Sequence, residues 1–374
     1  MANPLTGPSG PGDRAVVGGS TDPADRAPHR GGGRAAHMSH RPAVMADVAR
    51  LAGVSHQTVS RVLNQHPSVR PATRERVLAA IQAVDYRRNS AARALVTRRS
   101  HTIGVVSFDT TLYGPASTLY GVEQAARQAG YFVTVASVKT INRRTVHEAL
   151  DRLAEQAVEG LIVIAPQREA AEAVAELPRG LPVVAVEGGS GPGFPVVCVD
   201  QAEGARQVTR HMLDLGAPTV WHIAGPVDWL EAESRVQGWQ DALVAAGVPV
   251  PEPLRGDWSP ASGYGAGRRI SGQDGLRAVF VANDQMALGL LRAFHERGIR
   301  VPDDVLVAGF DDVPEAAYFT PPLTTVRQDF TAVGRRSIDL LLRQIADGAG
   351  GDDRAVVAPR LIVRQSTAGR EVPL

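Results

Sequence analysis

The spacing of apolar residues divides the chain into a short helical region and a longer region in which strands and helices alternate. Between residues 45 and 64 the apolar positions recur every three or four residues in two runs, which predicts two helices separated by a short turn at Gly53. Ser55 is placed to cap the second helix, and Pro71 suits the first turn of a third. The pattern predicts a small three-helix domain containing a helix-turn-helix.

From residue 102 onward, short apolar runs typical of strands are interleaved with helical stretches. Strands are expected at 102–108, 131–136, 160–165, 182–186, 219–223, 278–282 and 304–308. Helices are expected at 119–129, 145–156, 202–215, 233–246, 284–297 and 331–346. Such alternation is typical of parallel α/β sheets, and roughly 260 residues are too many for one doubly wound sheet. Two similar subdomains are therefore expected.

Composition adds little to this picture except at the N-terminus. The chain has 374 residues, and its 44% hydrophobic and 21% charged residues are typical of globular proteins. Residues 1–40 are rich in Gly, Pro and Ala without periodicity, so we expect a disordered tail. The single cysteine, Cys198, allows no internal disulfide and no multi-cysteine metal site, and is expected to be a buried thiol. Because we find neither a signal-peptide core nor a membrane-span pattern, we expect a cytoplasmic protein.

Charge is distributed unevenly along the chain. The formal net charge is +1, yet residues 39–100 hold eleven arginines against three carboxylates, a net charge of +8. Residues 101–374 carry −8. A basic module joined to an acidic body is the pattern expected when only one part of a protein meets nucleic acid.

The second short helix has the residue types of a recognition helix. Arginine pairs bidentately with guanine and glutamine with adenine in the major groove, which gives His56, Gln57 and Arg61 the chemistry to read base edges. Nearby hydroxyl and amide groups can bind phosphates and set the register: Ser55, Thr58, Ser60 and Asn64. The alternative interpretation is an ordinary helix with an exposed polar face.

These motifs resemble a known family. The segments DVARLAGVSHQTVSRVLN and VRPATRERVLAAIQAVDYRRNSAARAL resemble the lactose/galactose repressor (LacI/GalR) family, and the likeness extends to about residue 366. It implies that a hinge helix follows the helix-turn-helix and inserts Leu95 into the minor groove, where an apolar wedge kinks the duplex. It also implies DNA contacts by Thr73, Asn89 and Ala92. Two departures are Arg88, where relatives carry proline, and Val44, where a hydroxyl cap would be expected.

The body contains no recognisable enzyme motif but has residue types suited to sugars. The Gly-rich stretch at 187–195 runs into prolines instead of opening a helix, and no spacing of carboxylates or histidines predicts a metal site. We therefore expect no enzyme, no cofactor and no metal. Polar and aromatic residues follow several strands: Trp258, Asn283, Asp311, Gln328 and Phe330. Amides and carboxylates bind sugar hydroxyls and aromatic rings cover sugar C–H faces, although each residue alone could be structural.

The resemblance, which is to the lactose repressor branch in particular, assigns these five residues to an effector cleft. It adds Arg235 from the same lobe, and Leu112, Gly114 and Pro115 from the other. Glu187 and Glu231 stand at two cleft positions where that branch carries aspartate and serine. The longer acids reshape the pocket, so a saccharide effector is better supported than a β-galactoside.

The sequence thus predicts an α/β two-lobed core like a periplasmic binding protein, made of two Rossmann-like parallel-sheet subdomains, behind an all-α DNA-binding head. The expected division is a tail at 1–40, a helix-turn-helix domain at 41–89, a hinge helix at 90–100 and a core at 101–374. Within the core, 101–199 and 327–374 form one subdomain and 200–326 the other. The chain ends without a heptad helix, so a homodimer on a pseudo-palindromic operator is expected.

The predicted function is transcriptional repression relieved by a saccharide, without membrane partners. One alternative is a regulator whose ligand strengthens DNA binding, as purine-responsive members of the family do. Others are a sugar-binding transport or sensory protein and a sugar-metabolising enzyme. The basic head argues against the transport protein, and the enzyme would need catalytic groups that the motifs do not supply.

Overall fold

The computed structural model describes residues 43–87, 99–138, 143–164, 166–169, 172, 180–187, 194–348 and 353–368. The expected tail and nearly all of the expected hinge helix lie outside these residues. The chain divides into two compact units, Met1–Arg88 and Asn89–Leu374. Each unit is described by itself.

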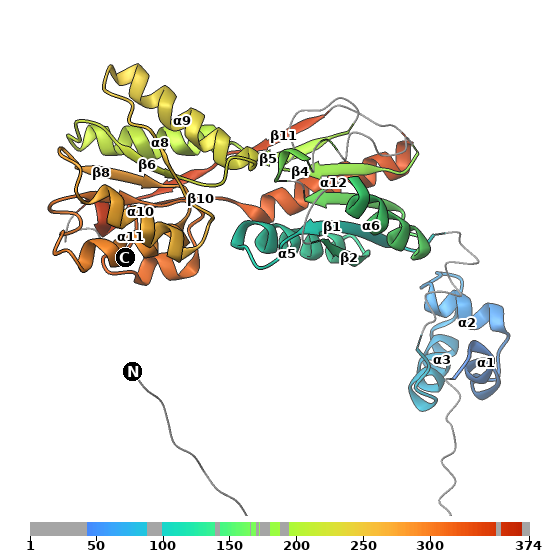
Figure 1. Cartoon of the computed structure of the whole chain (residues 1–374). Helices are drawn as coiled ribbons and strands as arrows, with labels where there is room; N and C mark the ends of the chain where they lie inside the picture. The colour runs from blue at the N-terminus through green and yellow to red at the C-terminus, as the bar shows by residue number, and fades with distance from the viewer. Residues whose placement is uncertain are drawn as a thin grey trace, which may run out of the picture. The chain divides into compact units, whose positions relative to one another are not determined.

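The first unit is a bundle of three helices, α1 (Met45–Ala52), α2 (His56–Leu63) and α3 (Pro71–Ala83) (Figure 1). Val48, Val59 and Val77, one from each helix, are completely buried and form the centre of its core. The expected helix-turn-helix is therefore present.

The two helix starts in this unit differ as the sequence predicts. Ser55 caps α2, because its Oγ accepts a hydrogen bond of 3.2 Å from the Thr58 N–H. Val44, at the N-cap of α1, has no acceptor to offer. The Asp47 carboxylate instead accepts the Val44 N–H at 3.1 Å, which is one half of a capping box. Gly53 ends α1 with φ +63°, a conformation that favours glycine.

The second unit has two lobes, each built on a parallel sheet, which lie side by side in Figure 1. The first-lobe sheet has the strand order β11-β5-β4-β3-β1-β2. Its strands are β1 (Thr102–Phe108), β2 (Phe132–Val138), β3 (Gly160–Ile164), β4 (Val183–Val186), β5 (Val196–Val199) and β11 (Arg354–Val357). Its helices are α5 (Tyr113–Gln128), α6 (Arg143–Glu155) and α12 (Phe330–Asp347). Helices α5 and α12 pack on one face and α6 on the other.

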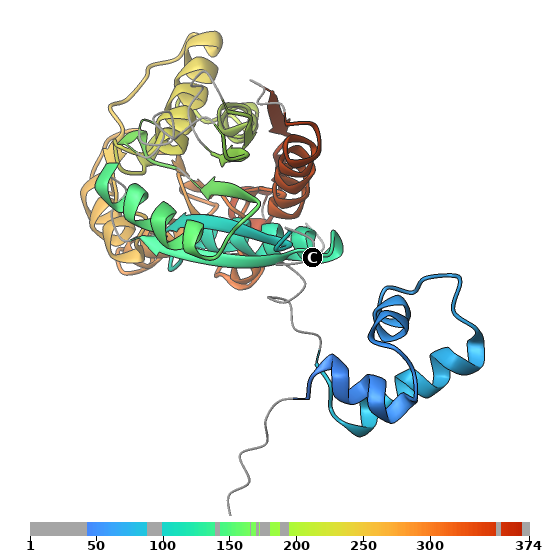
Figure 2. The ribbon, with the colours of Figure 1, turned by 90° about the vertical axis from the view of Figure 1, so that its right-hand side faces the viewer.

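The second-lobe sheet has the order β7-β6-β8-β9. Its strands are β6 (Trp221–Ala224), β7 (Leu254–Arg255), β8 (Ala278–Val281) and β9 (Leu306–Ala308). Its helices are α8 (Gln201–Asp214), α9 (Leu230–Ala246), α10 (Pro260–Ile270) and α11 (Asp284–His295), followed by the 3₁₀ helix η1 (Pro314–Tyr318). Helices α8 and α9 cover one face and α10 and α11 the other, and the perpendicular view shows helices around the strands of both lobes (Figure 2). The predicted two-lobed α/β architecture is confirmed.

The chain crosses between the lobes three times: after β5, between β10 (Thr325–Arg327) and α12, and between β11 and β12 (Arg360–Ile362). β12 pairs with β10 in an antiparallel ribbon, and the last described helix, α13 (Gln365–Ala368), packs near β9. These contacts correct one expected boundary, because residues 360–368 belong with the second lobe and not with the first.

Apart from the hinge helix, which lies almost entirely outside the described residues, each expected strand and helix is present, with small shifts at its ends. The largest shift is at α5, which begins at Tyr113 instead of residue 119 and carries Pro115 in its first turn, where proline is tolerated. The apolar pattern did not predict β5, β7, α10 or the β10–β12 ribbon. Cys198, on β5, is buried and free, as expected.

Candidate functional site

The α2 helix presents its polar residues outward and its apolar residues inward. His56, Gln57 and Arg61 are exposed, whereas Val59 and Val62 are buried. The expected base-reading groups therefore share the open side of the helix, which a recognition helix requires.

The expected phosphate-binding residues flank this surface. Ser55 and Thr58 share a hydroxyl hydrogen bond of 3.0 Å, and the Asn64 amide lies 3.5 Å from the Ser60 hydroxyl. Thr73 lies half-buried in the first turn of α3. The remaining expected DNA contacts fall outside the described residues: Asn89, Ala92 and Leu95.

A cavity of about 230 Å³ lies between the two lobes. Ten of the eleven residues expected to bind effector line it: Leu112, Gly114, Pro115, Glu231, Arg235, Trp258, Asn283, Asp311, Gln328 and Phe330. They come from the start of α5, the start of α9, the loops after β7, β8 and β9, and the crossover into α12. We call this space the interlobe cavity.

Arg235 lies at the centre of the polar wall. Its side chain is 2% exposed. Nε donates a 2.9 Å hydrogen bond to Gln201 Oε1, and Nη1 donates to the Ala282 carbonyl. Nη2 faces two carboxylates, 3.7 Å from Glu231 Oε2 and 3.7 Å from Asp311 Oδ1. The guanidinium also lies 3.9 Å from the centroid of the Phe310 ring, so its position is fixed on several sides.

A chain of side-chain amides continues from this arginine to the crossover segment. The Gln201 amide donates at 2.8 Å to Gln328 Oε1, and the Gln328 amide donates at 2.7 Å to Asp311 Oδ1. Residues from the second lobe and from the crossover therefore share one buried network. Because such a network has few alternative arrangements, a ligand that enters it is sensitive to the relative position of the lobes.

Two carboxyls of the wall have raised pKa values. Burial raises the pKa of Glu231 to about 7, although Arg235 lowers it, and the nearby Asp311 adds to the rise. Burial likewise raises the pKa of Asp311 to about 6, against the effects of Arg235 and the Gln328 hydrogen bond. The positive charge of Arg235 therefore only partly offsets the effect of burial on the pKa values of these two carboxyls.

Trp258 forms the largest aromatic wall. Its φ of +72° is unusual for a bulky residue, and its ring lies edge-to-face with Trp229 at 5.4 Å between centroids. The far edge of the ring touches the backbone at Gly225, where any Cβ would collide with it. Nε1 is buried and has no hydrogen-bond partner within the described part of the chain.

Asn283 both caps a helix and lines the interlobe cavity. Its Oδ1 accepts the Met286 N–H at 2.9 Å and so caps α11, while its Nδ2 donates to the Trp258 carbonyl at 3.1 Å. The cap interpretation and the site interpretation of this residue both apply. The adjacent Asp284 points elsewhere, accepting from the Val313 N–H at 2.9 Å, and burial raises its pKa well above the usual range.

Glu187 is the one expected effector residue outside the interlobe cavity. Its Oε1 accepts the Val199 N–H at 3.1 Å, and it faces a flanking cavity of about 450 Å³. Of the residues lining the interlobe cavity, only Glu231 also lines the flanking one. Burial, with Glu231 beside it, raises the pKa of Glu187 well above its usual range.

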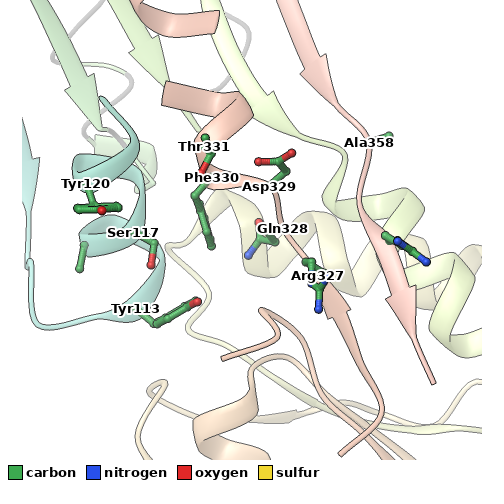
Figure 3. Close-up of a pocket in the computed structure, with 11 residues that line it drawn as sticks. Tyr113, Ser117, Tyr120, Arg327, Gln328, Asp329, Phe330, Thr331 and Ala358 are labelled. Carbon is green, nitrogen blue, oxygen red and sulfur yellow. The ribbon is translucent and has the colours of Figure 1, made fainter. Parts of the chain in front are cut away.

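A third hollow, of about 810 Å³, lies on the far side of the aromatic pair Tyr113 and Phe330. Figure 3 shows Ser117 and Tyr120 of α5 on one wall and the segment from Arg327 to Thr331 on the other. Tyr113 and Phe330 meet edge-to-face at 5.9 Å and line this hollow and the interlobe cavity alike.

Several residues of the interlobe cavity were not predicted from the sequence: Thr111, Tyr113, Trp229, Asp257, Ser259, Pro260 and Gln285. Trp229 and Gln285 follow strand ends, as the predicted residues do, so position relative to the strands was a usable signal. Among the described residues there is no cluster of three or more potential metal ligands, and no described helix is long and apolar enough to span a membrane.

Comparison with known proteins gives two family matches. Residues 44–89 match the family described as bacterial regulatory proteins, lacI family, and residues 209–367 match the periplasmic binding protein-like domain. The lactose operon repressor of Escherichia coli (strain K12) is 33% identical over 329 residues, which cover 87% of this chain and 91% of that protein. A transcriptional repressor named PurR, from Haemophilus influenzae, is 31% identical over 334 residues, or 87% of this chain and 98% of that protein.

Solved structures agree with these matches. The lac repressor dimer bound to operator and the anti-inducer ONPF superimposes with a TM-score of 0.79 at 33% identity, covering 87% of this chain and 99% of that one. A complex of the transcriptional regulator CelR with cellobiose has a TM-score of 0.64 at 33% identity, covering 87% of this chain and all of that one.

Proposed function

The chain belongs to the lacI family of bacterial regulatory proteins, and from this premise we propose that it represses transcription as a homodimer and releases its operator when a saccharide binds between the lobes. The observation that carries the effector proposal is the interlobe cavity. It is lined by carboxylates, amides and a guanidinium together with aromatic rings. Polar groups of these kinds bind ring hydroxyls, and the rings cover apolar C–H faces.

The DNA-binding part of the proposal rests on the first unit. The exposed face of α2 carries His56, Gln57 and Arg61, and the segment around it has a net charge of +8. Phosphate contacts would supply most of the affinity and the three side chains the sequence preference. Because operator DNA lies in the cytoplasm, we propose that location for the protein. The proposal assigns it no catalytic step.

The coupling between the two functions is a shift between two states. An effector in the interlobe cavity would touch Leu112 and Pro115 on the first lobe, and Arg235 and Asp311 on the second. It would therefore favour one relative orientation of the lobes, which are joined by three crossovers. The change in operator affinity cannot exceed the difference in effector affinity between the two states.

The test is a fluorescence anisotropy titration of the full chain on DNA from upstream of its own gene, at fixed salt, with and without neutral, amino and anionic saccharides. The interlobe cavity of about 230 Å³ lies below the usual range of roughly 300 to 1,000 Å³ for ligand sites, so the panel starts with monosaccharides and extends to cellobiose. We expect one class to weaken binding. Binding that appears only with ligand would support a co-repressor mechanism, the sign of response known for purine-responsive members.

A further inference from the structure

The charges around the interlobe cavity are unbalanced. Three carboxylates line it, Glu231, Asp257 and Asp311, and the only cation among its lining residues in the described part of the chain is Arg235. Asp257 is held ionised, because hydrogen bonds from the Ser259 hydroxyl and N–H lower its pKa. A ligand that enters the cavity therefore meets more negative than positive charge.

The single guanidinium is largely occupied by the protein. Two of its nitrogens are used by Gln201 and by the Ala282 carbonyl. The third lies 3.7 Å from Glu231 and 3.7 Å from Asp311, too far from either for a normal hydrogen bond. Nη2 is thus the nitrogen of Arg235 left for a ligand, and it already faces two carboxylates.

Glu231 is the least satisfied of the three carboxylates. Asp311 receives the Gln328 amide at 2.7 Å, and Asp257 receives the Ser259 N–H at 2.9 Å. No donor in the described part of the chain lies within hydrogen-bond distance of the Glu231 carboxylate, whose side chain is only 16% exposed. A largely buried carboxylate without a donor costs free energy, and a ligand that supplies one recovers it.

The aromatic residues of the lining are also suited to a cation. The rings of Trp229, Trp258, Tyr113 and Phe330 all line the cavity. Aromatic faces attract ammonium groups, most strongly where water is excluded. Carboxylates together with aromatic faces fit an ammonium group.

We propose that the effector is an amino sugar, with its protonated amine against Glu231 and a ring hydroxyl on Asp311. This inference rests on the proposed function and names the chemical class of ligand for the same cavity. It makes Glu231 the residue that determines the charge specificity of the response. Sugars that carry a phosphate or carboxylate would be rejected.

The groups that face Glu231 from the surrounding elements are Arg235 on its own helix, Asp311 after β9 and Glu187 after β4. Two of the three are carboxyls. A ligand cation at this position would therefore favour the ionised form of Glu231 and reduce its repulsion with its acidic neighbours.

The test is isothermal titration calorimetry on the full chain at pH 7 with matched sets of sugars. Glucose, galactose and mannose are each compared with their 2-amino and N-acetylated 2-amino forms, and glucose 6-phosphate serves as the anionic probe. For the sugar of the right configuration, we expect the amine to bind about tenfold more tightly than the N-acetylated form, the ratio expected of a hydrogen bond to a charged group.

Two variants make the assignment specific. Glu231→Gln keeps the shape and removes the charge, so it should abolish the preference for the amine. Asp241→Asn makes the same kind of change on the same helix at a side chain 44% exposed, so it should keep the preference. Equal or tighter binding of a neutral form, or of the phosphate, would overturn the inference while leaving the saccharide repressor intact. Binding of no sugar of any charge would overturn both.

Discussion

In the interlobe cavity, Arg235 lies between the carboxylates of Glu231 and Asp311. Replacing it with alanine would remove the partner of Glu231 and Asp311 and the donor to the Ala282 carbonyl. We predict that Arg235→Ala still binds operator but is no longer released by saccharide, and that its unfolding free energy falls by about 3 kcal/mol, because a buried pair is broken.

Anisotropy with and without sugar checks the first part of this prediction, and chemical denaturation checks the second. Arg292→Ala, an exposed arginine on α11 whose side chain is 69% accessible, is the matched control and should behave like the wild type. Normal release by saccharide in the Arg235 variant would contradict the assignment of this cavity.

The raised pKa of Glu231 predicts a pH dependence of stability. Its pKa is about 7 in the folded protein and close to 4.5 when unfolded, so the folded state holds the extra proton between these values. Stability contributed by this group is therefore present at low pH and lost as pH rises through about 7. Relative to the wild type, Glu231→Gln should gain roughly 1 to 3 kcal/mol between about pH 5 and about pH 8.

Thermal and urea unfolding of both proteins across this pH range measure the difference, in which the titration of groups remote from Glu231 cancels. His222 is one such group, because burial lowers its pKa to about 3 and acid destabilises the fold through it in the opposite direction. A constant difference between the two proteins would show that Glu231 does not titrate in this range.

At the residue scale, the sequence predicted the cavity well where residue type and strand position coincide. Asn283, Asp311 and Trp258 follow strands and carry sugar-binding chemistry, and the structure brings them together. Glu187 also follows a strand, but the Val199 N–H holds it toward the flanking cavity. That choice depends on a tertiary contact between β4 and β5, which a linear pattern does not contain.

At the scale of elements, α10 is a helix that its glycines make difficult to predict from the sequence. A Cβ at Gly263 would lie 2.6 Å from the carbonyl carbon of Met286 on α11, so glycine allows the two helices to touch there. We predict that Gly263→Ala lowers the unfolding free energy by about 1 to 3 kcal/mol through overpacking.

Gly265 provides a matched control in the same helix. It is exposed and has nothing within 4 Å of an added Cβ, so Gly265→Ala should raise stability by up to about 1 kcal/mol through helix propensity. Urea denaturation of the two variants tests the pair. Equal effects would contradict the close packing of α10 on α11.

The same glycines explain why the apolar pattern missed α10 while it found most other helices. PASGYGAGRRI contains three glycines in eleven residues and reads as a loop. The helix exists because Ser259 caps it and because small residues let it pack on α11. The strand β5 was missed for another reason, since four apolar residues after a Gly- and Pro-rich stretch are too few to show a period.

At the scale of the whole molecule, we predict that the homodimer interface involves exposed apolar side chains of the first lobe. Strand β2 lies at the edge of its sheet, with Phe132 70% exposed, and Tyr120 on the neighbouring α5 is 65% exposed. Phe and Tyr are enriched at protein interfaces. We predict that Phe132→Glu is monomeric and binds operator more weakly, because two half-sites are no longer joined.

Light scattering after size-exclusion chromatography measures the oligomeric state. Val244→Glu, at a position 68% exposed on α9, is the control and should remain dimeric. A dimeric Phe132 variant would place the interface elsewhere on the molecule.

The central claim is that a saccharide bound in the interlobe cavity lowers the affinity of the helix-turn-helix for operator DNA. The most direct test follows one labelled operator fragment by anisotropy while wild-type protein is titrated at fixed salt, with and without saturating saccharide. The account predicts that the midpoint moves to higher protein concentration with sugar, while binding to unrelated DNA does not change. A midpoint that stays in place for every saccharide, or moves to lower protein concentration, would contradict it.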